Sequence, residues 1–429
     1  MQQELRKKIK QKKAKIAVIG LGYVGLPLAV EFAKKGFQVF GIDKDKDRVK
    51  NARACVSYIL DVPSAEMKKV IKPKKLIPTE EFSALNETDV VIICVPTPLK
   101  RKNQPNISYI LSAVKEISRH LHKGQLVILE STTYPGTTDE VIKPILEKNG
   151  LICGKDFFLA FSPERIDPGN KKFLVHKIPK VVGGITKEAA LLVKELYSQV
   201  IEKIVVVSSS RVAETVKLLE NTFRLVNIGL VNEMAMMANK MGIDIWEVID
   251  AAKTKPFGFM PFYPGPGVGG HCIPKDPLYL YWKAKHHGFK SKFIKLASQI
   301  NSNMPVYVSN RIEDKIGFLK NKKILVIGVT YKKDVKDLRK SPAIDLIKIL
   351  IGKGTNISYH DPLIPYLRFE EINLKSIAIS KSSLRRFDCV IIMTEHDLVN
   401  YKLIFRYSNF IFDTRNIFRC SNSDRLIKL

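Results

Sequence analysis

The stretch Lys15-Ile-Ala-Val-Ile-Gly-Leu-Gly-Tyr-Val-Gly25 decides the fold of this chain. Apart from Lys15, its first residues are apolar and mostly β-branched, which favours a short buried strand. Three glycines spaced as Gly-x-Gly-x-x-Gly follow, and the pattern then becomes helical through Lys35. Glycines with this spacing between a strand and a helix let the backbone approach a pyrophosphate at the helix N-terminus. The stretch therefore predicts a dinucleotide-binding unit.

An acidic residue stands where the second strand of such a unit ends. Residues 38–42 predict that strand, and Asp43 follows it directly. A carboxylate at this place accepts hydrogen bonds from both ribose hydroxyls and repels a 2′-phosphate. We therefore expect NAD rather than NADP as the cofactor, although Lys44 and Lys46 stand close by.

The rest of the chain alternates apolar strands with helical segments. Residues 211–252 have helical periodicity with almost no breakers, the Pro/Gly-rich stretch 256–277 interrupts it, and helix resumes over 278–301. Short apolar runs predict further strands at 90–95, 126–130, 204–207, 323–328, 356–360, 389–394 and 410–413. The expected fold class is α/β, with two doubly wound Rossmann-like domains joined by a long central helix.

This pattern also predicts domain boundaries. The expected segments are a basic lead-in at 1–14, an NAD-binding Rossmann domain at 15–210, a central helical dimerisation domain carrying Cys272 at 211–310, and a second Rossmann-like domain at 311–429. The last of these lacks the glycine motif, so we expect it to hold a different nucleotide.

The composition limits the compartment and the partners. A chain of 429 residues is too long for a single core. Its net charge of +29 is spread through every segment, and no nucleic-acid module appears, so we interpret it as a lysine-rich surface that attracts small anions. The six cysteines are scattered without a C-x-x-C pair, which indicates a reducing compartment, the cytoplasm, and no metal site.

Two stretches resemble targeting signals only superficially. The apolar run from Ile16 to Phe32 is split by three glycines and a proline, and the dinucleotide motif explains it better than a membrane span does. Residues 1–13 are rich in Lys, Arg and Gln and lack the apolar centre of a signal peptide, so we expect a short solvated helix.

Cys272 is a residue that simple hydride transfer does not need. It lies in Tyr-Pro-Gly-Pro-Gly-Val-Gly-Gly-His-Cys-Ile-Pro-Lys-Asp-Pro, residues 263–277. A thiol held among glycines beside Asp276 is placed like a nucleophile that traps an aldehyde. This arrangement suggests an alcohol oxidised past the aldehyde to the acid, whereas the adjacent His271 is interpreted as shaping the loop.

Three polar positions outside this loop are candidates for proton transfer. Lys217 and Asn221 lie four residues apart in the long helical segment and so share one face. An ammonium and an amide side by side can polarise a hydroxyl or a water, although a solvated polar face explains the spacing equally well. Glu164 in Phe-Ser-Pro-Glu-Arg could act as a general base, although surface acids after proline are common.

Together these motifs resemble the UDP-glucose/GDP-mannose dehydrogenase family over essentially the whole chain after residue 14. The matching motifs, in the family's order, are Gly20 to Gly25, Cys-Val-Pro-Thr-Pro at 94–98, Glu-Ser-Thr at 130–132, Ser-Pro-Glu at 162–164, Lys217 with Asn221, Gly-Gly-His-Cys at 269–272 with Asp276, and Asp-Leu-Arg-Lys-Ser-Pro at 337–342. Agreement at so many separated sites is not a matter of chance.

The resemblance implies a four-electron oxidation of a nucleotide sugar at C6, with two NAD used in turn. Cys272 would attack the aldehyde to give a thiohemiacetal, whose oxidation leaves a thioester. Lys217, Asn221 and Asp276 would hold the developing oxyanion and an ordered water, and Thr132 would support that water.

Further site residues follow from the same resemblance. Glu164 would assist hydrolysis of the thioester, and Arg339 would lie near the phosphates of cofactor and substrate. The implied cofactor contacts are Gly20, Gly22, Tyr23, Val24, Gly25, Asp43, Arg48, Pro96, Thr97, Thr132 and Arg339. The implied substrate contacts are Glu164, Arg165, Lys217, Asn221, Tyr263, Gly265, Gly267, Gly269 and Arg339.

The loop before Cys272 resembles the branch of the family that acts on UDP-N-acetylhexosamines. This likeness rests on Lys-Pro-Phe-Gly-Phe at 255–259 and on Gly-Gly-His-Cys-Ile-Pro, whereas Lys275 stands where that branch often has an apolar residue. The likeness implies UDP-N-acetylglucosamine as substrate, for surface polysaccharide assembly, with the galacto epimer and UDP-glucose as alternatives. It also implies a homodimer or higher homo-oligomer through the central helix, without nucleic-acid or membrane partners.

Two other classes of protein are weaker alternatives. A two-electron hydroxyacid dehydrogenase shares the dinucleotide motif and a helical Lys/Asn pair, but it leaves Cys272 and the last domain without a purpose. A non-catalytic basic nucleotide-binding protein is supported only by the net charge.

Overall fold

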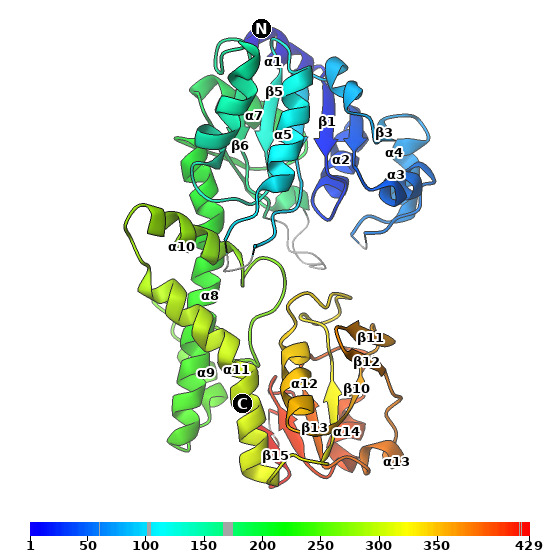
Figure 1. The fold of residues 1–429 in the computed structure, drawn as a ribbon, viewed down its shortest axis with the longest axis vertical. Coiled ribbons are helices and arrows are strands. Elements are labelled where there is room, and N and C mark those ends of the chain that lie inside the picture. Colours follow the sequence, from blue (N-terminus) through cyan, green and yellow to red (C-terminus); the bar gives the residue numbers. More distant parts are fainter. Residues whose placement is uncertain (60, 101–103, 166–174, 420, 422) are drawn as a thin grey trace. The chain divides into compact units, whose positions relative to one another are not determined.

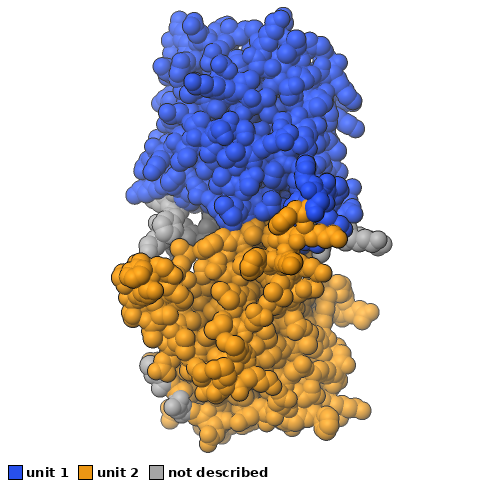
Figure 2. Space-filling model, turned by 90° about the vertical axis from the view of Figure 1, so that its left-hand side faces the viewer, with its two compact units in different colours: residues 1–220, 278–288 blue, residues 221–277, 289–429 orange. Residues whose placement is uncertain are grey.

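The computed structural model describes residues 1–59, 61–100, 104–165, 175–419, 421 and 423–429 (Figure 1). The chain divides into two compact units, drawn in blue and orange in Figure 2. The first unit comprises residues 1–220 and 278–288, and the second comprises residues 221–277 and 289–429. Each unit has its own sheet. Among the described residues, no helix is both long and apolar enough to cross a membrane.

The first unit is a doubly wound α/β domain built on an eight-stranded sheet. The strand order is β3-β2-β1-β4-β5-β6-β7-β8, and neighbours are parallel except for the pair β6 and β7. The order reverses between β1 and β4, and sheets of this kind bind ligands at that switch point, beyond the carboxyl ends of the strands. The strands are β1 (Lys15–Ile19), β2 (Gln38–Ile42), β3 (Leu76–Thr79), β4 (Val90–Ile93), β5 (Leu126–Leu129), β6 (Phe158–Phe161), β7 (Lys180–Gly184) and β8 (Ile204–Val207).

Helices cover both faces of this sheet because alternate residues of each strand point to opposite sides. In β1, Ile16 and Val18 belong to one buried cluster, and Ala17 and Ile19 belong to another. The helices are α1 (Gln2–Lys10), α2 (Gly25–Lys34), α3 (Lys46–Arg53), α4 (Ser64–Ile71), α5 (Ser108–His120), α6 (Lys143–Leu146) and α7 (Lys187–Tyr197).

The N-terminal segment is the predicted short helix, but it is docked on one apolar face and not solvated all round. Helix α1 buries Leu5 and Ile9 in the core of the first unit. Lys8 Nζ donates to the Asp89 carboxylate at 2.7 Å. Leu5 and Ile9 lie four residues apart and share one face, and this apolar face decides where the lysine-rich segment packs.

The second unit contains a smaller doubly wound domain. Its five-stranded sheet is parallel throughout, in the order β10-β9-β13-β14-β15, with a switch point between β9 and β13. The strands are β9 (Lys323–Ile327), β10 (Asn356–His360), β13 (Cys389–Ile392), β14 (Ile411–Asp413) and β15 (Leu426–Lys428), beside a separate hairpin of β11 (Tyr366–Phe369) and β12 (Ile372–Lys375). Its helices are α12 (Pro342–Gly352), α13 (Lys381–Leu384) and α14 (Tyr401–Tyr407). The predicted fold class, two doubly wound domains with a long helix between them in the sequence, is confirmed.

The helix predicted for 211–252 is broken once. Helix α8 spans Ser210–Lys240 and α9 spans Ile245–Ala252. Between them, Gly242 has a φ of +69°, and the Asp244 carboxylate caps α9. Glycine adopts this left-handed conformation without steric cost and commonly ends a helix.

The helix predicted for 278–301 is two helices for a similar reason. Helix α10 spans Asp276–His286 and α11 spans Lys292–Ile316. Gly288, with a φ of +80°, lies between them. The hydrophobic periodicity continued across both breaks, so periodicity alone did not reveal them.

A buried carboxylate near the start of α8 anchors that helix within the first unit. Glu214 is fully buried and accepts hydrogen bonds from the backbone N–H of Gly136 at 2.6 Å and of Thr138 at 2.9 Å. The hydroxyl of Thr138 donates to the same carboxylate at 2.6 Å. Burial raises the pKa of Glu214 to about 7, although these hydrogen bonds act in the opposite direction.

Exchange of Glu214 for glutamine is expected to change how stability depends on pH. Because the folded-state pKa is raised from 4.5 to about 7, the stability that the neutral group contributes is complete below pH 4.5 and is lost as the pH rises through about 7. The total loss is about 3 kcal/mol. The variant Glu214→Gln lacks this titration. Urea unfolding should therefore show that the free energy of unfolding of the variant rises relative to that of the wild type between about pH 5 and about pH 8.

A matched control is Glu140→Gln, which alters an exposed carboxylate on the same turn that pairs with Lys283. This control should not gain stability relative to the wild type at the higher pH. An identical difference between Glu214→Gln and wild type at both pH values would contradict the raised pKa.

Candidate active site

The turn between β1 and α2 explains why each glycine is needed. Gly20 has a φ of +96°, and a Cβ there would lie 2.6 Å from the carbonyl oxygen of Cys94. A Cβ on Gly25 would lie 1.8 Å from the Gly20 oxygen, so α2 packs directly against the turn. At Gly22, by contrast, the nearest described atom is a guanidinium nitrogen of Arg48, 3.9 Å away. This open side, at the N-terminus of a helix, fits the pyrophosphate of NAD.

Asp43 is held in place by hydrogen bonds from nearby backbone N–H groups. Its Oδ2 accepts the N–H of Leu21 at 2.7 Å, and its Oδ1 accepts the N–H of Asp45 at 2.9 Å. Arg48 Nη1 lies 3.4 Å from Oδ2. Each carboxylate oxygen has two lone pairs, so the group retains acceptor capacity for ribose hydroxyls.

The other residues predicted to contact the cofactor follow β1, β4 and β5. Tyr23 is exposed and Val24 directly precedes α2. Pro96 is exposed and Thr97 is buried after β4, while Thr132 is half-buried after β5. Because these three strands are parallel neighbours, the five residues gather at one edge of the sheet.

Glu164 lies next to a buried ion pair that the sequence did not reveal. Lys180 Nζ is 2.8 Å from Glu130 Oε1 and 3.6 Å from Glu164 Oε2. Burial alone would lower the pKa of Lys180, but the carboxylates of Glu130 and Glu164 outweigh burial and raise it. The hydroxyl of Tyr197 also donates to Glu130. Glu130 belongs to the Glu-Ser-Thr motif, but nothing in the sequence distinguishes Lys180 from a surface lysine.

Arg165, predicted to contact the substrate, is engaged with the protein itself. Its Nη1 donates to the carbonyl of Pro179 at 2.6 Å, and its Nη2 lies 2.6 Å from the Glu220 carboxylate on α8. Glu164, Arg165 and Lys180 line one surface cavity together with Leu28 of α2.

The second unit brings Asn221 and Asp276 together beside the Cys272 loop. Both side chains are buried, and the Asn221 amide donates to Asp276 Oδ2 at 2.7 Å. The N–H groups of Asp276 and Lys275 donate to the Cys272 carbonyl at 2.8 and 3.0 Å. Cys272 is exposed, and α10 begins at Asp276. An amide and a carboxylate are thus fixed one helical turn from an exposed thiol.

The remaining predicted catalytic residues belong to the first unit. Lys217 is half-buried on α8, one turn before Asn221. Thr132 and Glu164 follow β5 and β6, which are parallel neighbours in the sheet. The first unit therefore presents Lys217, Thr132 and Glu164, and the second presents Cys272, Asn221 and Asp276.

Packing within the second unit explains several glycines of the Cys272 loop. A Cβ on Gly269 would lie 2.6 Å from Tyr331 Cβ, and one on Gly270 would lie 2.7 Å from the Tyr331 ring. The N–H of Gly270 donates to the Arg339 carbonyl at 2.9 Å, and Gly267 has a φ of +126°. Gly269 and Gly270 thus leave room for the chain's own Tyr331.

The start of the same loop is anchored on the central helices. The N–H of Gly265 donates to Asn232 Oδ1 at 2.9 Å, and Asn232 in turn donates to Asn301 at 2.8 Å. The ring of Tyr263 stacks on Trp246 with centroids 5.9 Å apart. These contacts hold the predicted substrate loop against α8, α9 and α11.

Arg339 is oriented by a neighbouring acid. Its Nε and Nη2 lie 2.9 and 2.6 Å from Asp337 Oδ2. The guanidinium remains about half exposed, so it can still meet an anion. The pairing fixes the direction of the side chain within the second unit.

Lys275 is a buried cation beside the predicted nucleophile. Its Nζ lies 3.2 Å from His271 Nδ1 and 3.8 Å from Asp276 Oδ1. Burial, together with the charge of Lys275, lowers the pKa of His271 to about 4, so His271 is a neutral acceptor at physiological pH. This contact agrees with the interpretation of His271 as a residue that shapes the loop.

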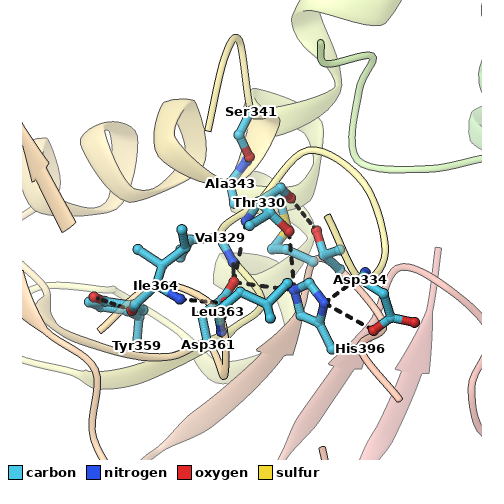
Figure 3. A network of polar contacts seen from close by, with 12 residues as sticks. Val329, Thr330, Asp334, Ser341, Ala343, Tyr359, Asp361, Leu363, Ile364 and His396 are labelled. Carbon is cyan, nitrogen blue, oxygen red and sulfur yellow. Dashed lines mark hydrogen bonds and ion pairs between the residues drawn. The ribbon is translucent and has the colours of Figure 1, made fainter. Parts of the chain in front are cut away.

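At the carboxyl edge of the second sheet, a buried histidine joins three segments (Figure 3). His396 Nε2 lies 3.2 Å from Asp361 Oδ2 and 3.1 Å from Thr330 Oγ1, and its Nδ1 accepts the N–H of Asp334 at 3.0 Å. Asp361 also accepts the N–H of Val329 at 2.7 Å. The sequence predicted a nucleotide in this domain, but no motif singled out His396.

The chain matches three family models in succession. They describe the NAD binding domain of the UDP-glucose/GDP-mannose dehydrogenase family over residues 14–201, its central domain over 211–303 and its UDP binding domain over 325–420. The three models together span most of the sequence.

Individual relatives agree with these models. The chain is 41% identical to UDP-N-acetyl-D-glucosamine 6-dehydrogenase of Pseudomonas aeruginosa, over 82% of this chain and 83% of the relative. It is 37% identical to the enzyme of the same name from Salmonella typhi, over 89% and 90% of the two chains. The solved structure of UDP-D-ManNAc dehydrogenase from Pyrococcus horikoshii superposes with a TM-score of 0.88 at 33% identity, covering 96% of this chain and 98% of that one. The chain therefore belongs to the UDP-glucose/GDP-mannose dehydrogenase family and is an NAD-dependent oxidoreductase of nucleotide sugars.

Proposed function

We propose that this enzyme oxidises the C6 alcohol of UDP-N-acetylglucosamine to a carboxylate. Two relatives, at 41% and 37% identity, carry that activity in their names. The observation that carries the four-electron chemistry is the exposed thiol of Cys272, one turn from the buried pair of Asn221 and Asp276. A single hydride transfer would not require a nucleophilic thiol.

In this proposal Cys272 forms and releases the covalent intermediate. The first oxidation removes a hydride from C6 and the hydroxyl proton, which gives the aldehyde. The Cys272 sulfur then bonds to C6, the aldehyde oxygen takes up a proton, and loss of a second hydride and that proton gives the thioester. Water adds to the thioester carbon, the carbon–sulfur bond breaks, and the carboxylate leaves as the thiol is restored. The Gly20–Gly25 turn and Asp43 would hold NAD, which would supply the hydride acceptor for each oxidation.

The polar residues around the thiol stabilise charge and hold water. Asn221 gives one amide N–H to Asp276 and keeps a second with which it can donate to an oxyanion on C6. Lys217, one turn earlier on the same helix, supplies a positive charge for that oxyanion, and Thr132 holds the ordered water. Glu164, paired with Lys180, takes the proton of the water that hydrolyses the thioester.

One observation favours a second substrate, UDP-N-acetylmannosamine. The Pyrococcus horikoshii structure, with its TM-score of 0.88, is named for that sugar, as are several relatives at 34–38% identity. The two sugars differ only in the configuration at C2, which a pocket distinguishes by a few contacts.

We further infer a cytoplasmic enzyme whose product serves surface polysaccharide assembly.

The stoichiometry of NADH tests both the chemistry and the sugar. With limiting nucleotide sugar, we expect two NADH per UDP-N-acetylglucosamine and little turnover of the manno and galacto epimers or of UDP-glucose. One NADH per sugar would rule out the acid-forming mechanism. Two NADH with another of the four sugars alone would keep the mechanism and reassign the substrate.

Replacement of Cys272 by serine is expected to abolish acid formation. A hydroxyl at neutral pH is a far weaker nucleophile than a thiolate, so kcat should fall by on the order of 10³ or more, while the Kd of NAD measured by fluorescence stays unchanged. The matched control is Cys153→Ser, because burial raises the pKa of Cys153 to about 11 and leaves it inert. Normal acid formation by Cys272→Ser would exclude the thioester.

An exposed apolar face supports a homodimer, and we propose that it forms the subunit interface. Along α8 and at the residue directly after it, five exposed side chains are spaced by seven, four, three and four residues, which places them on one helical face. They are Phe223, Leu230, Met234, Met237 and Met241. A contiguous apolar surface of this kind is typical of a protein interface.

Two charged substitutions on this face should separate the subunits. Leu230→Lys combined with Met237→Lys places two ammonium groups on the apolar face, so sedimentation equilibrium at micromolar protein should give the monomer mass. The control Leu398→Lys, at a leucine that is 76% exposed in the C-terminal domain, should keep the wild-type mass. A wild type that is itself monomeric, or a double variant of unchanged mass, would contradict the interface.

A further inference from the structure

The basic loop after β9 lies where a doubly wound sheet binds its ligand. It leaves the carboxyl end of β9 at Val329 and runs to Ser341, beside the switch point between β9 and β13. Its basic residues are Lys332, Lys333, Lys336, Arg339 and Lys340. The loop also holds Asp334 and Asp337, so it keeps an excess of three positive charges, which favours the phosphates of a nucleotide. The N–H of Gly270 also donates to the Arg339 carbonyl in this loop, so the loop contacts the segment that carries Cys272.

The hydrogen bonds around His396 assign its tautomer. The hydroxyl of Thr330 donates to the Lys332 carbonyl at 3.0 Å, so its oxygen accepts from His396 Nε2. The Nε2 proton is thus shared between Thr330 and Asp361, at 3.1 and 3.2 Å. Nδ1 accepts the backbone N–H of Asp334 at 3.0 Å and therefore carries no proton. Every polar atom of this fully buried ring has a partner (Figure 3).

These contacts fasten the first half of the basic loop to the end of β13. Thr394 Oγ1 donates to the Thr330 carbonyl at 2.6 Å, and the N–H of Asp397 donates to Asp334 Oδ1 at 3.0 Å. Asp334 has a φ of +55°, a conformation that non-glycine residues rarely adopt without support. Its own N–H is satisfied by His396, so the histidine holds the loop at its strained residue.

We propose that His396 is a positioning residue for the nucleotide diphosphate. It fixes the backbone of Asp334 through Nδ1 and thereby shapes the basic loop that receives the phosphates. This assignment rests on the proposed function, in which the C-terminal domain holds the UDP portion of the substrate. It adds a residue that neither the motifs nor the predicted site contained.

Two substitutions separate the two ring nitrogens. In His396→Asn the amide oxygen falls near the Nδ1 position and can still accept the N–H of Asp334. In His396→Gln the amide nitrogen falls near the Nε2 position and can still donate to Asp361, but the bond to Asp334 is lost. Calorimetric titration with UDP should give a Kd within about threefold of wild type for the Asn variant and at least about tenfold weaker for the Gln variant.

Three controls and one direct measurement on the loop show whether the effect belongs to the loop. Thermal unfolding establishes that both variants are folded, and the Kd of NAD, whose site lies in the first unit, should remain unchanged in both. His360→Gln, which alters a histidine whose Nδ1 contacts the Ile377 carbonyl at 2.7 Å, should leave UDP binding intact. Hydrogen exchange at residue 334 should quicken in the Gln variant and not in the Asn variant.

Wild-type UDP affinity in both folded variants would overturn the positioning role. Equal weakening in both, with equal loss of thermal stability, would also overturn it, because a merely structural role predicts that result. A wild-type enzyme that binds no UDP would instead refute the proposed function, and this assignment with it.

Discussion

The hydrogen bond between Asn221 and Asp276 is the contact on which the site depends. It joins the long helix α8 to the first residue of α10, and so ties the Cys272 loop to the central scaffold. Both groups are buried, so breaking the bond would cost the Asn221 amide a hydrogen bond away from water. The same helix begins in the first unit, where Glu214 binds two backbone N–H groups of the turn after β5. Helix α8 therefore carries Glu214 in the first unit and Asn221 in the second.

Buried carboxylates recur in this protein, and their neighbours decide what each can do. Glu130 lies 2.8 Å from the ammonium of Lys180, which balances its charge, and the same ammonium lies 3.6 Å from Glu164. Glu214 has three neutral donors and forms no ion pair with the described residues, and its pKa is raised to about 7 by burial. The carboxylate of Glu130, beside Glu164, is thus held by an ion pair, whereas that of Glu214, which anchors α8, is held by neutral donors.

The sequence predicted the dinucleotide turn and nine of the strands, because both signals are local. The predicted bounds of β2, β8 and β10 agree with the structure residue by residue, whereas β3, β6, β7, β11, β12 and β15 were not predicted. The break at Gly242 and the docking of α1 were missed, because periodicity identifies an apolar face without saying where it ends or what it packs against. Lys180 and His396 were missed for a different reason. Their partners lie about fifty and thirty-five or more residues away in the chain, and only the fold brings them together.

Both doubly wound domains have an aspartate directly after the second strand, but the two aspartates make different hydrogen bonds. Asp43 and Asp361 each end the second strand of their sheet and each accept an N–H from the turn after the first strand. The carboxylate of Asp361, however, is also occupied by the N–H groups of Thr330, Leu363 and Ile364 and by His396. A saturated carboxylate has no acceptor left for an adenosine ribose. The second domain is therefore closed to an adenosine ribose at the place where the first can accept one, because backbone N–H groups and His396 already occupy the Asp361 carboxylate.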